Sequence, residues 1–445
     1  MKTFITEKHQ AAAITSLQRL VKVPSYLQDG IEGAPFGQDV LDSLTECLEI
    51  FKEEGFTTFV DPEGYYGYAE IGSGPEIFGV LCHMDVVPAG DLSLWETPAF
   101  EGTIKEGAIY GRGVQDDKGP TIAALYAVKA LVEADVTFDK TIRFIFGTDE
   151  ENLWRCMEQY HKKERGIDMG IAPDANFPVI YAEKGLLQVM LTGEGSSDFE
   201  VEGGSALNVV SDTAIYRGKE VEAVKTELAK LGYDYQEING DIHVKGKSIH
   251  SKDAPAGINA NTRLAEALTH VYDQQGLKLL GEKIKGDANG VSAIGEFADE
   301  ASGKLTFNAA TVKIDHEKTE IGIDIRIPVT VDKEEVVSQL TNLAKAYGFE
   351  YHEHDYLASL YVPVDSELVT TLLGAYRDLT GDLTEPQISG GATFARTMDN
   401  CVAFGAMFNE TKDTMHQPNE VWQLAEMTKT MEIYAEAIYR LCSKG

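Results

Sequence analysis

The chain contains 445 residues, and 39 basic against 72 acidic side chains give a formal net charge of −33 at pH 7. Nucleic acid is excluded as the main partner, because phosphate backbones are recognised by clustered Lys and Arg side chains. The sequence has no polybasic segment and no apolar run of about 18 residues, so no membrane attachment is expected.

The first part of the chain alternates helical and strand-like patterns. Helices are expected at residues 6–23 and 38–54, and short apolar runs typical of buried strands occur at residues 77–82, 141–146 and 167–172. A further helical run is expected at residues 121–132, and its first part, 121–128, is apolar almost all round, which predicts a helix packed deep against a sheet. This alternation predicts a mainly parallel sheet with helices on both faces.

The pattern changes after residue 184. Alternating, half-exposed strands of an antiparallel sheet are expected at residues 186–191, 242–245, 304–314 and 320–329, with helices at 259–274 and 332–347. A helical pattern resumes near residue 364, followed by a buried strand at 402–408 and a helix at 424–441. We therefore predict an α/β domain (residues 1–184 and 363–445) interrupted by an inserted α+β domain (residues 185–362).

The cysteines indicate a reducing compartment. They are odd in number, scattered and never arranged as Cys-x-x-Cys: Cys47, Cys82, Cys156, Cys401 and Cys442. The first residues also lack the apolar stretch of a signal peptide. We expect a cytoplasmic protein.

Polar side chains follow each expected buried strand. His83 and Asp85 follow the first strand, an Asp-Glu-Glu run (149–151) the second and Asp174 the third, while an Asp-Asp pair (116–117) opens the apolar helix. The carboxyl ends of parallel strands meet at one edge of a sheet. One His and up to six carboxylates would meet there, and their repulsion is tolerable only with cations among them. The carboxylates are Asp85, Asp116, Asp117, Glu150, Glu151 and Asp174.

Each of these signals is weak alone. A His-x-Asp or an acidic triplet is expected by chance in so acidic a chain, and an Asp-Asp pair in a glycine-rich turn is more often a helix cap. Only their joint placement predicts a metal site. His352-x-His354 is more simply a solvated strand face, Gly111-x-Gly113 lacks the third glycine of a dinucleotide fingerprint, and no cysteine has a catalytic context.

Five ordered motifs resemble the co-catalytic zinc peptidases of the aminoacylase, desuccinylase and glutamate-carboxypeptidase superfamily. They are residues 83–88, 110–119, 147–151, 172–174 and 415–420. Residues 95–100, 148–157 and 183–185 are most similar to the PepV-type bacterial dipeptidases. The sequence departs from the family at Asn152-Leu153, where a small residue commonly follows the paired Glu.

The resemblance implies two divalent metal ions, with zinc as the default and manganese or cobalt as alternatives. It implies that His83 and Asp174 hold one ion, Glu151 and His416 hold the other, and Asp116 bridges both. Two neighbouring ions would lower the pKa of a water molecule and clamp a substrate oxygen. Asp85 would accept the second ring N–H of His83, and Glu150 would be the general base that passes the proton to the leaving amine.

The inserted domain would act as a lid on the catalytic α/β domain. By resemblance, His250 polarises the scissile carbonyl, Asn208 and Arg326 hold the substrate carboxylate, and Gly390 and Gly391 offer backbone N–H groups. A structural His, a turn Asn, an exposed strand Arg and a simple glycine turn are the alternatives for these positions.

The resemblance implies a metal-dependent dipeptidase that hydrolyses dipeptides with free termini. An N-acyl-amino-acid deacylase or desuccinylase would use the same metals. A non-catalytic metal-binding or interaction protein is a further alternative, but the presence of both Glu150 and Glu151 argues against it. The lid is longer than the minimal lid of dimeric relatives, so we expect a monomer, with a homodimer as the alternative.

Overall fold

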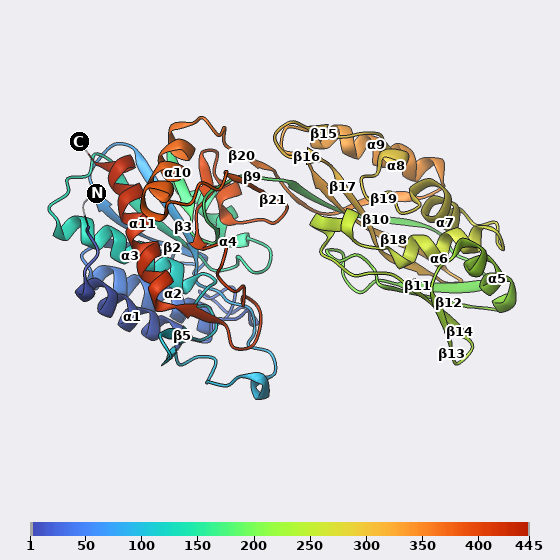
Figure 1. Cartoon of the computed structure of the whole chain (residues 1–445), viewed down its shortest axis with the longest axis horizontal. Helices are drawn as coiled ribbons and strands as arrows, with labels where there is room; N and C mark the ends of the chain where they lie inside the picture. The colour runs from blue at the N-terminus through green and yellow to red at the C-terminus, as the bar shows by residue number, and fades with distance from the viewer. Residues whose placement is uncertain (1–2, 444–445) are drawn as a thin grey trace. The chain divides into compact units, whose positions relative to one another are not determined.

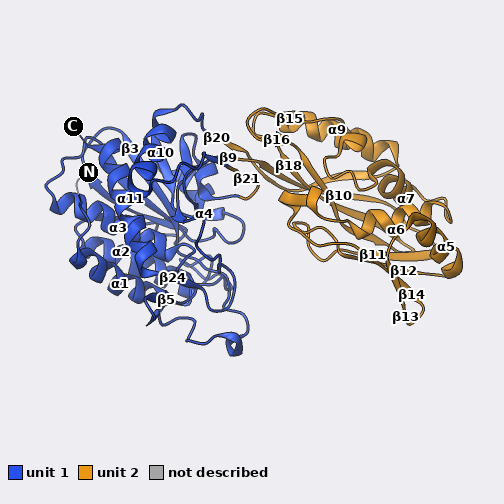
Figure 2. Cartoon of the chain, viewed as in Figure 1, with its two compact units in different colours: residues 1–181, 362–387, 392–445 blue, residues 182–361, 388–391 orange. Residues whose placement is uncertain are grey.

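The computed structural model describes residues 3–443, which form two compact units (Figure 2). Unit 1 contains the chain up to Tyr181, then Val362–Gln387 and the part from Ala392 onward; unit 2 contains Ala182–Tyr361 and Ile388–Gly391. The sequence placed the boundaries after residues 184 and 362, and it assigned residues 388–391 to the first domain. Those four residues group with unit 2, where the backbone N–H of Lys184 donates to the carbonyl of Ser389 at 2.9 Å.

Unit 1 is a sheet covered by helices (Figure 1). Its helices are α1 (Glu7–Val21), α2 (Gln38–Glu53), α3 (Lys118–Glu133), α4 (Arg155–Lys163), α10 (Glu367–Thr380) and α11 (Leu424–Cys442). The main-sheet strands are β1 (Thr57–Val60), β2 (Tyr66–Gly72), β3 (Ile77–His83), β6 (Thr141–Gly147), β7 (Met169–Ala172), β22 (Cys401–Ala403) and β9 (Ile180–Glu183). Smaller sheets are formed by β4 (Thr103–Lys105), β5 (Ala108–Tyr110) and β24 (Val421–Gln423), and by β8 (Ala175–Asn176) and β23 (Ala406–Met407); β21 (Gln387–Ser389) pairs with β9.

The order of the main strands is β1-β2-β6-β3-β7-β22-β9. The four strands β6, β3, β7 and β22 are parallel, and antiparallel pairs occur at both sides of them. His83, the last residue of β3, is paired with Gly147, the last residue of β6, so the two strands end level. Every residue of β3 is buried, which explains the continuous apolar run from which this strand was predicted.

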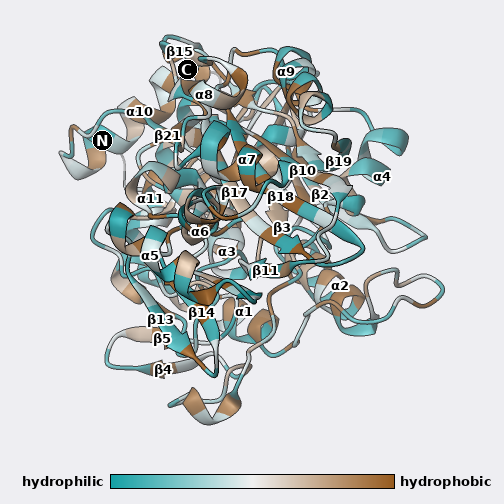
Figure 3. Ribbon diagram, turned by 90° about the vertical axis from the view of Figure 1, so that its right-hand side faces the viewer, coloured by the Kyte–Doolittle hydropathy of each residue, from teal (hydrophilic) through white to brown (hydrophobic). Residues whose placement is uncertain are grey.

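Helix α3 lies at the centre of the core of unit 1. All but three of its sixteen residues are buried, and it packs against α1, α11 and β3. Other helices are amphipathic, as the mixture of teal and brown on α2 shows in Figure 3. Helix α10 begins where the Ser366 hydroxyl accepts a hydrogen bond from the N–H of Val369, and it ends at Gly381 in the left-handed conformation.

The sequence prediction was wrong at one strand. Residues 402–408 were expected to form a single strand, but β22 ends at Ala403 and β23 begins at Ala406. Gly405 lies between them with φ of 68°, and a Cβ atom there would be 2.4 Å from the ring of Phe177. The turn at Gly405 therefore divides the apolar run into two short strands.

Unit 2 is an antiparallel sheet with helices. The strands of the sheet follow the order β13-β14-β12-β11-β17-β18-β10-β19. They are β10 (Gly185–Glu194), β11 (Phe199–Gly203), β12 (Thr213–Gly218), β13 (Tyr235–Ile238), β14 (Asp241–Lys245), β17 (Thr306–Ile314), β18 (Lys318–Ile327) and β19 (Glu350–Leu357). The remaining elements are β15 (Ala298–Asp299), β16 (Gly303–Lys304), β20 (Leu360–Tyr361), α5 (Val221–Leu231), α6 (Ala260–Thr269), α7 (Gln275–Lys278), α8 (Val291–Ile294) and α9 (Lys333–Ala346).

Unit 2 has its own apolar core, to which β10, β17, β18, α6 and α9 contribute buried side chains. The expected helix at 259–274 is shorter, because α6 ends at Thr269. An α/β domain interrupted by an α+β insertion was predicted, and this fold class is confirmed. Within residues 3–443, no helix combines the length and the apolar character needed to cross a membrane.

Candidate metal centre

The predicted ligands converge at one edge of the parallel sheet in unit 1. His83 ends β3, Glu151 follows β6, and Asp174 lies between β7 and β8. Asp116 lies in the turn that leads into α3, and His416 lies in the segment between β23 and β24. Residues from five separate parts of the chain therefore meet where the parallel strands end.

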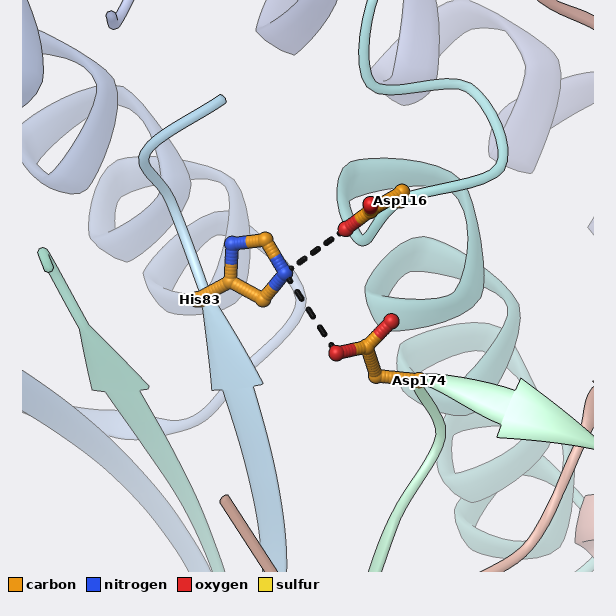
Figure 4. A group of neighbouring side chains, drawn as sticks. All are labelled: His83, Asp116 and Asp174. Carbon is orange, nitrogen blue, oxygen red and sulfur yellow. Dashed lines mark hydrogen bonds and ion pairs between the residues drawn. The ribbon is translucent and has the colours of Figure 1, made fainter. Parts of the chain in front are cut away.

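The five side chains form two groups of three that share Asp116. Potential ligand atoms of His83, Asp116 and Asp174 lie within 4.8 Å of one another, as do those of Asp116, Glu151 and His416. Figure 4 shows the first group, in which Nε2 of His83 is 2.9 Å from Oδ1 of Asp116 and 3.6 Å from Oδ2 of Asp174.

In the second group, Nε2 of His416 is 3.0 Å from Oδ2 of Asp116 and 3.1 Å from Oε2 of Glu151. Asp116 thus presents one carboxylate oxygen to each histidine. This is the geometry in which a single carboxylate bridges two positions.

The carboxylates and histidines at this edge shift one another's pKa values. Burial, and then the charge of Asp116, raise the pKa of Glu151 to about 7 and that of Asp174 to about 6. Contacts with Asp116 and Glu151 raise the pKa of His416 to about 10. Burial disfavours ionised Asp116, but the contacts with His416 and His83 outweigh it and lower the pKa of this carboxyl. Cations are the natural partners of such crowded carboxylates.

This donor set suits divalent ions of the zinc, manganese or cobalt type, because imidazole nitrogens and carboxylate oxygens are their common protein ligands. With three protein ligands each, ions held here would keep coordination positions for water or substrate, as catalytic sites require. The residues therefore fit two ions, one beside each histidine.

Asp85 is placed differently from the expectation. Nδ1 of His83 donates its hydrogen bond to the backbone carbonyl of Asp85 at 2.9 Å, whereas the Asp85 carboxylate is 3.6 Å from that nitrogen. The carboxylate instead accepts the backbone N–H groups of Glu150 at 3.1 Å and Glu151 at 3.0 Å. Asp85 thereby joins the end of β3 to the segment after β6.

Both backbone polar groups of Glu150 are hydrogen-bonded to side chains. Asp85 accepts its N–H, and the indole N–H of Trp154 donates to its carbonyl at 2.7 Å. Burial is the main cause that raises the pKa of the Glu150 carboxyl well above its ordinary value, and the charges of Asp174 and Glu151 add to it against the opposing effect of His83.

The remaining predicted carboxylate, Asp117, is fully buried and is the residue that precedes α3. Its Oδ2 accepts the backbone N–H of His83 and the hydroxyl of Thr121, both at 3.2 Å. A helix-cap role was the alternative for the Asp pair, but the Asp117 side chain makes no capping bond to the first N–H groups of α3. Asp117 supports the backbone of His83 instead.

The predicted lid residues all belong to unit 2. His250 and Asn208 are exposed, and the backbone carbonyl of Asn208 accepts the N–H of Ser251 at 2.8 Å. The ring Nδ1 of His250 accepts the N–H of Lys252 at 3.1 Å. Although His250 is exposed as a residue, partial desolvation of its ring, and then the charges of Arg326 and Lys252, lower its pKa, so the neutral form is favoured.

Arg326 is buried rather than exposed, and it is paired with a neighbouring carboxylate. Its Nε and Nη2 donate to the two oxygens of Asp324 at 2.9 and 3.1 Å, and its Nη1 donates to the carbonyl of Gly390 at 2.9 Å. The N–H of Gly391, expected to face the substrate, donates to Oγ of Ser389 at 2.9 Å.

Three supporting residues were not assigned roles from the sequence: Gln115, Trp154 and Glu420. All three lie within the family-like motifs, at residues 110–119, 148–157 and 415–420. Their place in these motifs is the signal in the sequence that points to them, but it does not show which hydrogen bonds they make.

Comparison with known proteins places this chain in a family. A family model described as "Peptidase family M20/M25/M40" matches residues 79–440. The chain is 34% identical over 463 residues to "Putative dipeptidase SAB1611c" of Staphylococcus aureus (strain bovine RF122 / ET3-1), with 98% of each chain covered. It is also 34% identical over 470 residues to "Putative dipeptidase SH1171" of Staphylococcus haemolyticus, with 99% of each covered.

Solved structures agree with the fold. The dipeptidase Dug1p of Saccharomyces cerevisiae matches with a TM-score of 0.61 at 16% identity, covering 97% of this chain and 96% of that chain. Human carnosine dipeptidase 1 matches with a TM-score of 0.58 at 15% identity, covering 98% and 97%. The predicted resemblance to the co-catalytic peptidase superfamily and the prediction of an enzyme are both confirmed. The chain belongs to peptidase family M20/M25/M40, and it is a metallopeptidase.

Proposed function

We propose that this metallopeptidase is a dipeptidase that uses two divalent metal ions. The observation that carries the proposal is the position of Asp116, whose two carboxylate oxygens face His83 and His416 in two ligand groups. The dipeptidase names of the relatives at 34% identity support the choice of substrate. A small-molecule dipeptide is therefore the proposed substrate.

His83 and Asp174 would hold one ion, Glu151 and His416 the other, and Asp116 both. When bound, the ions would lower the pKa of a water molecule and polarise the scissile carbonyl. Zinc is the proposed ion because mixed His and carboxylate ligands suit it, and manganese or cobalt would fit the same ligands.

Glu150 is the proposed general base. Its raised pKa makes its carboxylate a better proton acceptor. Its backbone N–H and carbonyl are hydrogen-bonded to Asp85 and Trp154. Glu150 would take a proton from the attacking water and deliver it to the amine that leaves when the peptide bond breaks. Asp85 is a supporting residue in this proposal, because its carboxylate binds the backbone of both glutamates.

The lid residues are proposed to contact the substrate. In neutral His250, Nδ1 accepts the N–H of Lys252, so the ring proton is on Nε2, where it can donate to a carbonyl oxygen. Arg326 and Asn208 are proposed to bind the free carboxylate, and the Gly390-Gly391 turn to line the same place. Because Asp324 already neutralises part of the charge of Arg326, this contact would hold the carboxylate less tightly than a free guanidinium would.

We also propose a cytoplasmic, monomeric enzyme. All five cysteines are free and buried, as expected for a reducing compartment.

A substrate panel tests the proposal. The purified chain, loaded with zinc, is given dipeptides with free termini, N-acetyl amino acids and succinylated diamino acids, and metal content is measured on the same sample. The expected result is two ions per chain and hydrolysis of the dipeptides. Hydrolysis of acylated substrates alone would show a deacylase or desuccinylase. Two bound ions without turnover of the dipeptides would refute the proposed dipeptidase activity.

A further inference from the structure

The segment that carries His416 needs support from outside itself. It lies between β23 and β24 and has no helix or strand of its own. Two of its residues that are not glycine have left-handed backbones, His416 with φ of 59° and Asn419 with φ of 62°. Such conformations are disfavoured for residues with a Cβ atom and persist where surrounding contacts determine them. The position of His416 therefore depends on whatever holds this segment.

Gln115 supplies much of that support on the side that precedes His416. Its amide nitrogen Nε2 donates to the carbonyl of Lys412 at 3.0 Å. Its Oε1 accepts both the backbone N–H of Thr414 at 3.0 Å and the Thr414 hydroxyl at 2.9 Å. Gln115 is only 2% exposed, so these three bonds are made where water does not replace them.

Glu420 holds the other side of the same segment. Its carboxylate accepts the backbone N–H groups of Gly113 at 3.1 Å and Gln115 at 2.8 Å, and it pairs with Arg112 at 2.6 Å. Both ends of the His416 segment are thus attached to the turn of residues 111–116. The last residue of that turn is Asp116, the carboxylate that His416 faces.

The geometry points to Gln115 as a positioning residue that sets His416 against Asp116 and so controls the affinity of one of the two metal positions. Within residues 3–443, the side-chain hydrogen bonds of Gln115 go to Lys412 and Thr414, both in the segment of His416. His83 instead ends β3, and its backbone N–H donates to the side chain of Asp117. Loss of Gln115 should therefore affect the ion beside His416 and spare the ion beside His83. This inference rests on the proposed two-ion centre.

The test compares zinc binding in the full-length wild-type protein and in two variants. Gln115→Leu has a similar size and removes all three bonds. Gln115→Glu keeps the acceptor for Thr414 but cannot donate to Lys412. The metal-free proteins are equilibrated in buffers of fixed free zinc concentration, and bound zinc is counted by elemental analysis. Gln38→Leu is the matched control, because Gln38 is an exposed amide at the start of α2 that donates to Asp42.

We expect wild type and Gln38→Leu to bind two ions. Gln115→Leu should bind one ion at the wild-type affinity and need about 10–100-fold more free zinc for the second, the usual effect of removing a residue that orients a ligand. The free zinc concentration that Gln115→Glu needs for its second ion should lie between the values for wild type and Gln115→Leu. Melting temperatures of the metal-free proteins separate this effect from general loss of structure, because a purely structural role would lower the melting temperature and weaken both ions together.

Two results would overturn the inference. If wild type binds two ions and Gln115→Leu binds both with unchanged affinity, or loses both in parallel, Gln115 has no selective role although the two-ion centre stands. If wild type itself binds fewer than two ions, the proposed centre is wrong and the inference falls with it.

Discussion

The indole N–H of Trp154 donates a hydrogen bond to the backbone carbonyl of Glu150 at 2.7 Å, four residues earlier in the chain. The ring of Trp154 also packs against Phe394 at 5.5 Å between centroids. Trp154 thus holds the proposed base, Glu150, at its backbone carbonyl. Removing the indole donor should displace the Glu150 carboxylate without changing a metal ligand.

Trp154→Phe keeps an aromatic ring and deletes the donor. We expect kcat to fall about tenfold with KM and metal content unchanged, because small displacements of a reacting group reduce rate strongly. Steady-state kinetics and elemental analysis measure these quantities. Trp95→Phe is the matched control, since Trp95 donates a similar bond to the carbonyl of Ala89 at 2.9 Å, and equal losses in both variants would contradict the proposed role.

Glu150→Gln should separate chemistry from metal binding. The amide has the same shape but cannot accept the proton, so turnover should fall by about 10²–10⁴-fold while both ions are retained. His83→Ala and His416→Ala should each lose an ion, because each removes an imidazole from one ligand group. Zinc content and dipeptide turnover are measured on the same preparations. Near-normal turnover of Glu150→Gln would refute Glu150 as the base.

Arg326→Lys tests recognition of the substrate carboxylate. Lysine can keep a contact with Asp324 but cannot reproduce the fork of the guanidinium, so KM for a dipeptide should rise about 10–100-fold. A dipeptide amide has no carboxylate, so its KM should be the same for the variant and for wild type. If KM rises equally for the dipeptide and its amide, Arg326 supports the structure of the lid and does not bind the carboxylate.

Asp299 should make unit 2 more stable at neutral than at acid pH. Burial acts to raise the pKa of its carboxyl, but hydrogen bonds from Thr330 and Ser302 outweigh it and lower the pKa below the ordinary value of 3.8. A pKa lowered by folding means that the stabilisation is present above pH 3.8 and is lost as pH falls through the lower folded value.

Asp299→Asn should therefore reduce the free energy of unfolding by about 1 kcal/mol at pH 7, the usual worth of such bonds at a partly exposed site. The difference from wild type should shrink below pH 4. Denaturant unfolding at a series of pH values measures it, with the exposed neighbour Glu300→Gln as the control. A difference that stays constant down to pH 3 would contradict the assignment.

The ligand positions could be predicted because they depend on strand ends. A buried apolar run followed by a polar residue is visible in the sequence, and parallel strands bring their carboxyl ends together, as His83 and Gly147 show by pairing in register. The break at Gly405 was missed because apolar residues flank it on both sides. The left-handed backbone at Gly405 and the ring of Phe177 against it, which require a glycine there, are visible only in the structure.

Contacts between supporting side chains could not be predicted in the same way. Whether the Asp85 carboxylate binds the ring of His83 or the backbone of Glu150 depends on differences of less than an ångström. The pairing of Arg326 with Asp324 neutralises part of a charge that was assigned from the sequence to the substrate carboxylate. Gln115 and Thr414 are far apart in the chain, so nothing local to either residue indicates their contact.

The interruption of unit 1 by unit 2 has a consequence for biosynthesis. His83, Asp116 and Asp174 are all translated before the insertion, whereas His416 follows the whole of it. Because chains emerge with the N-terminal part first, a nascent chain can complete one ligand group early, but the other must await translation of the final segment. The full centre is thus a product of finished synthesis, and a prematurely terminated chain would lack it.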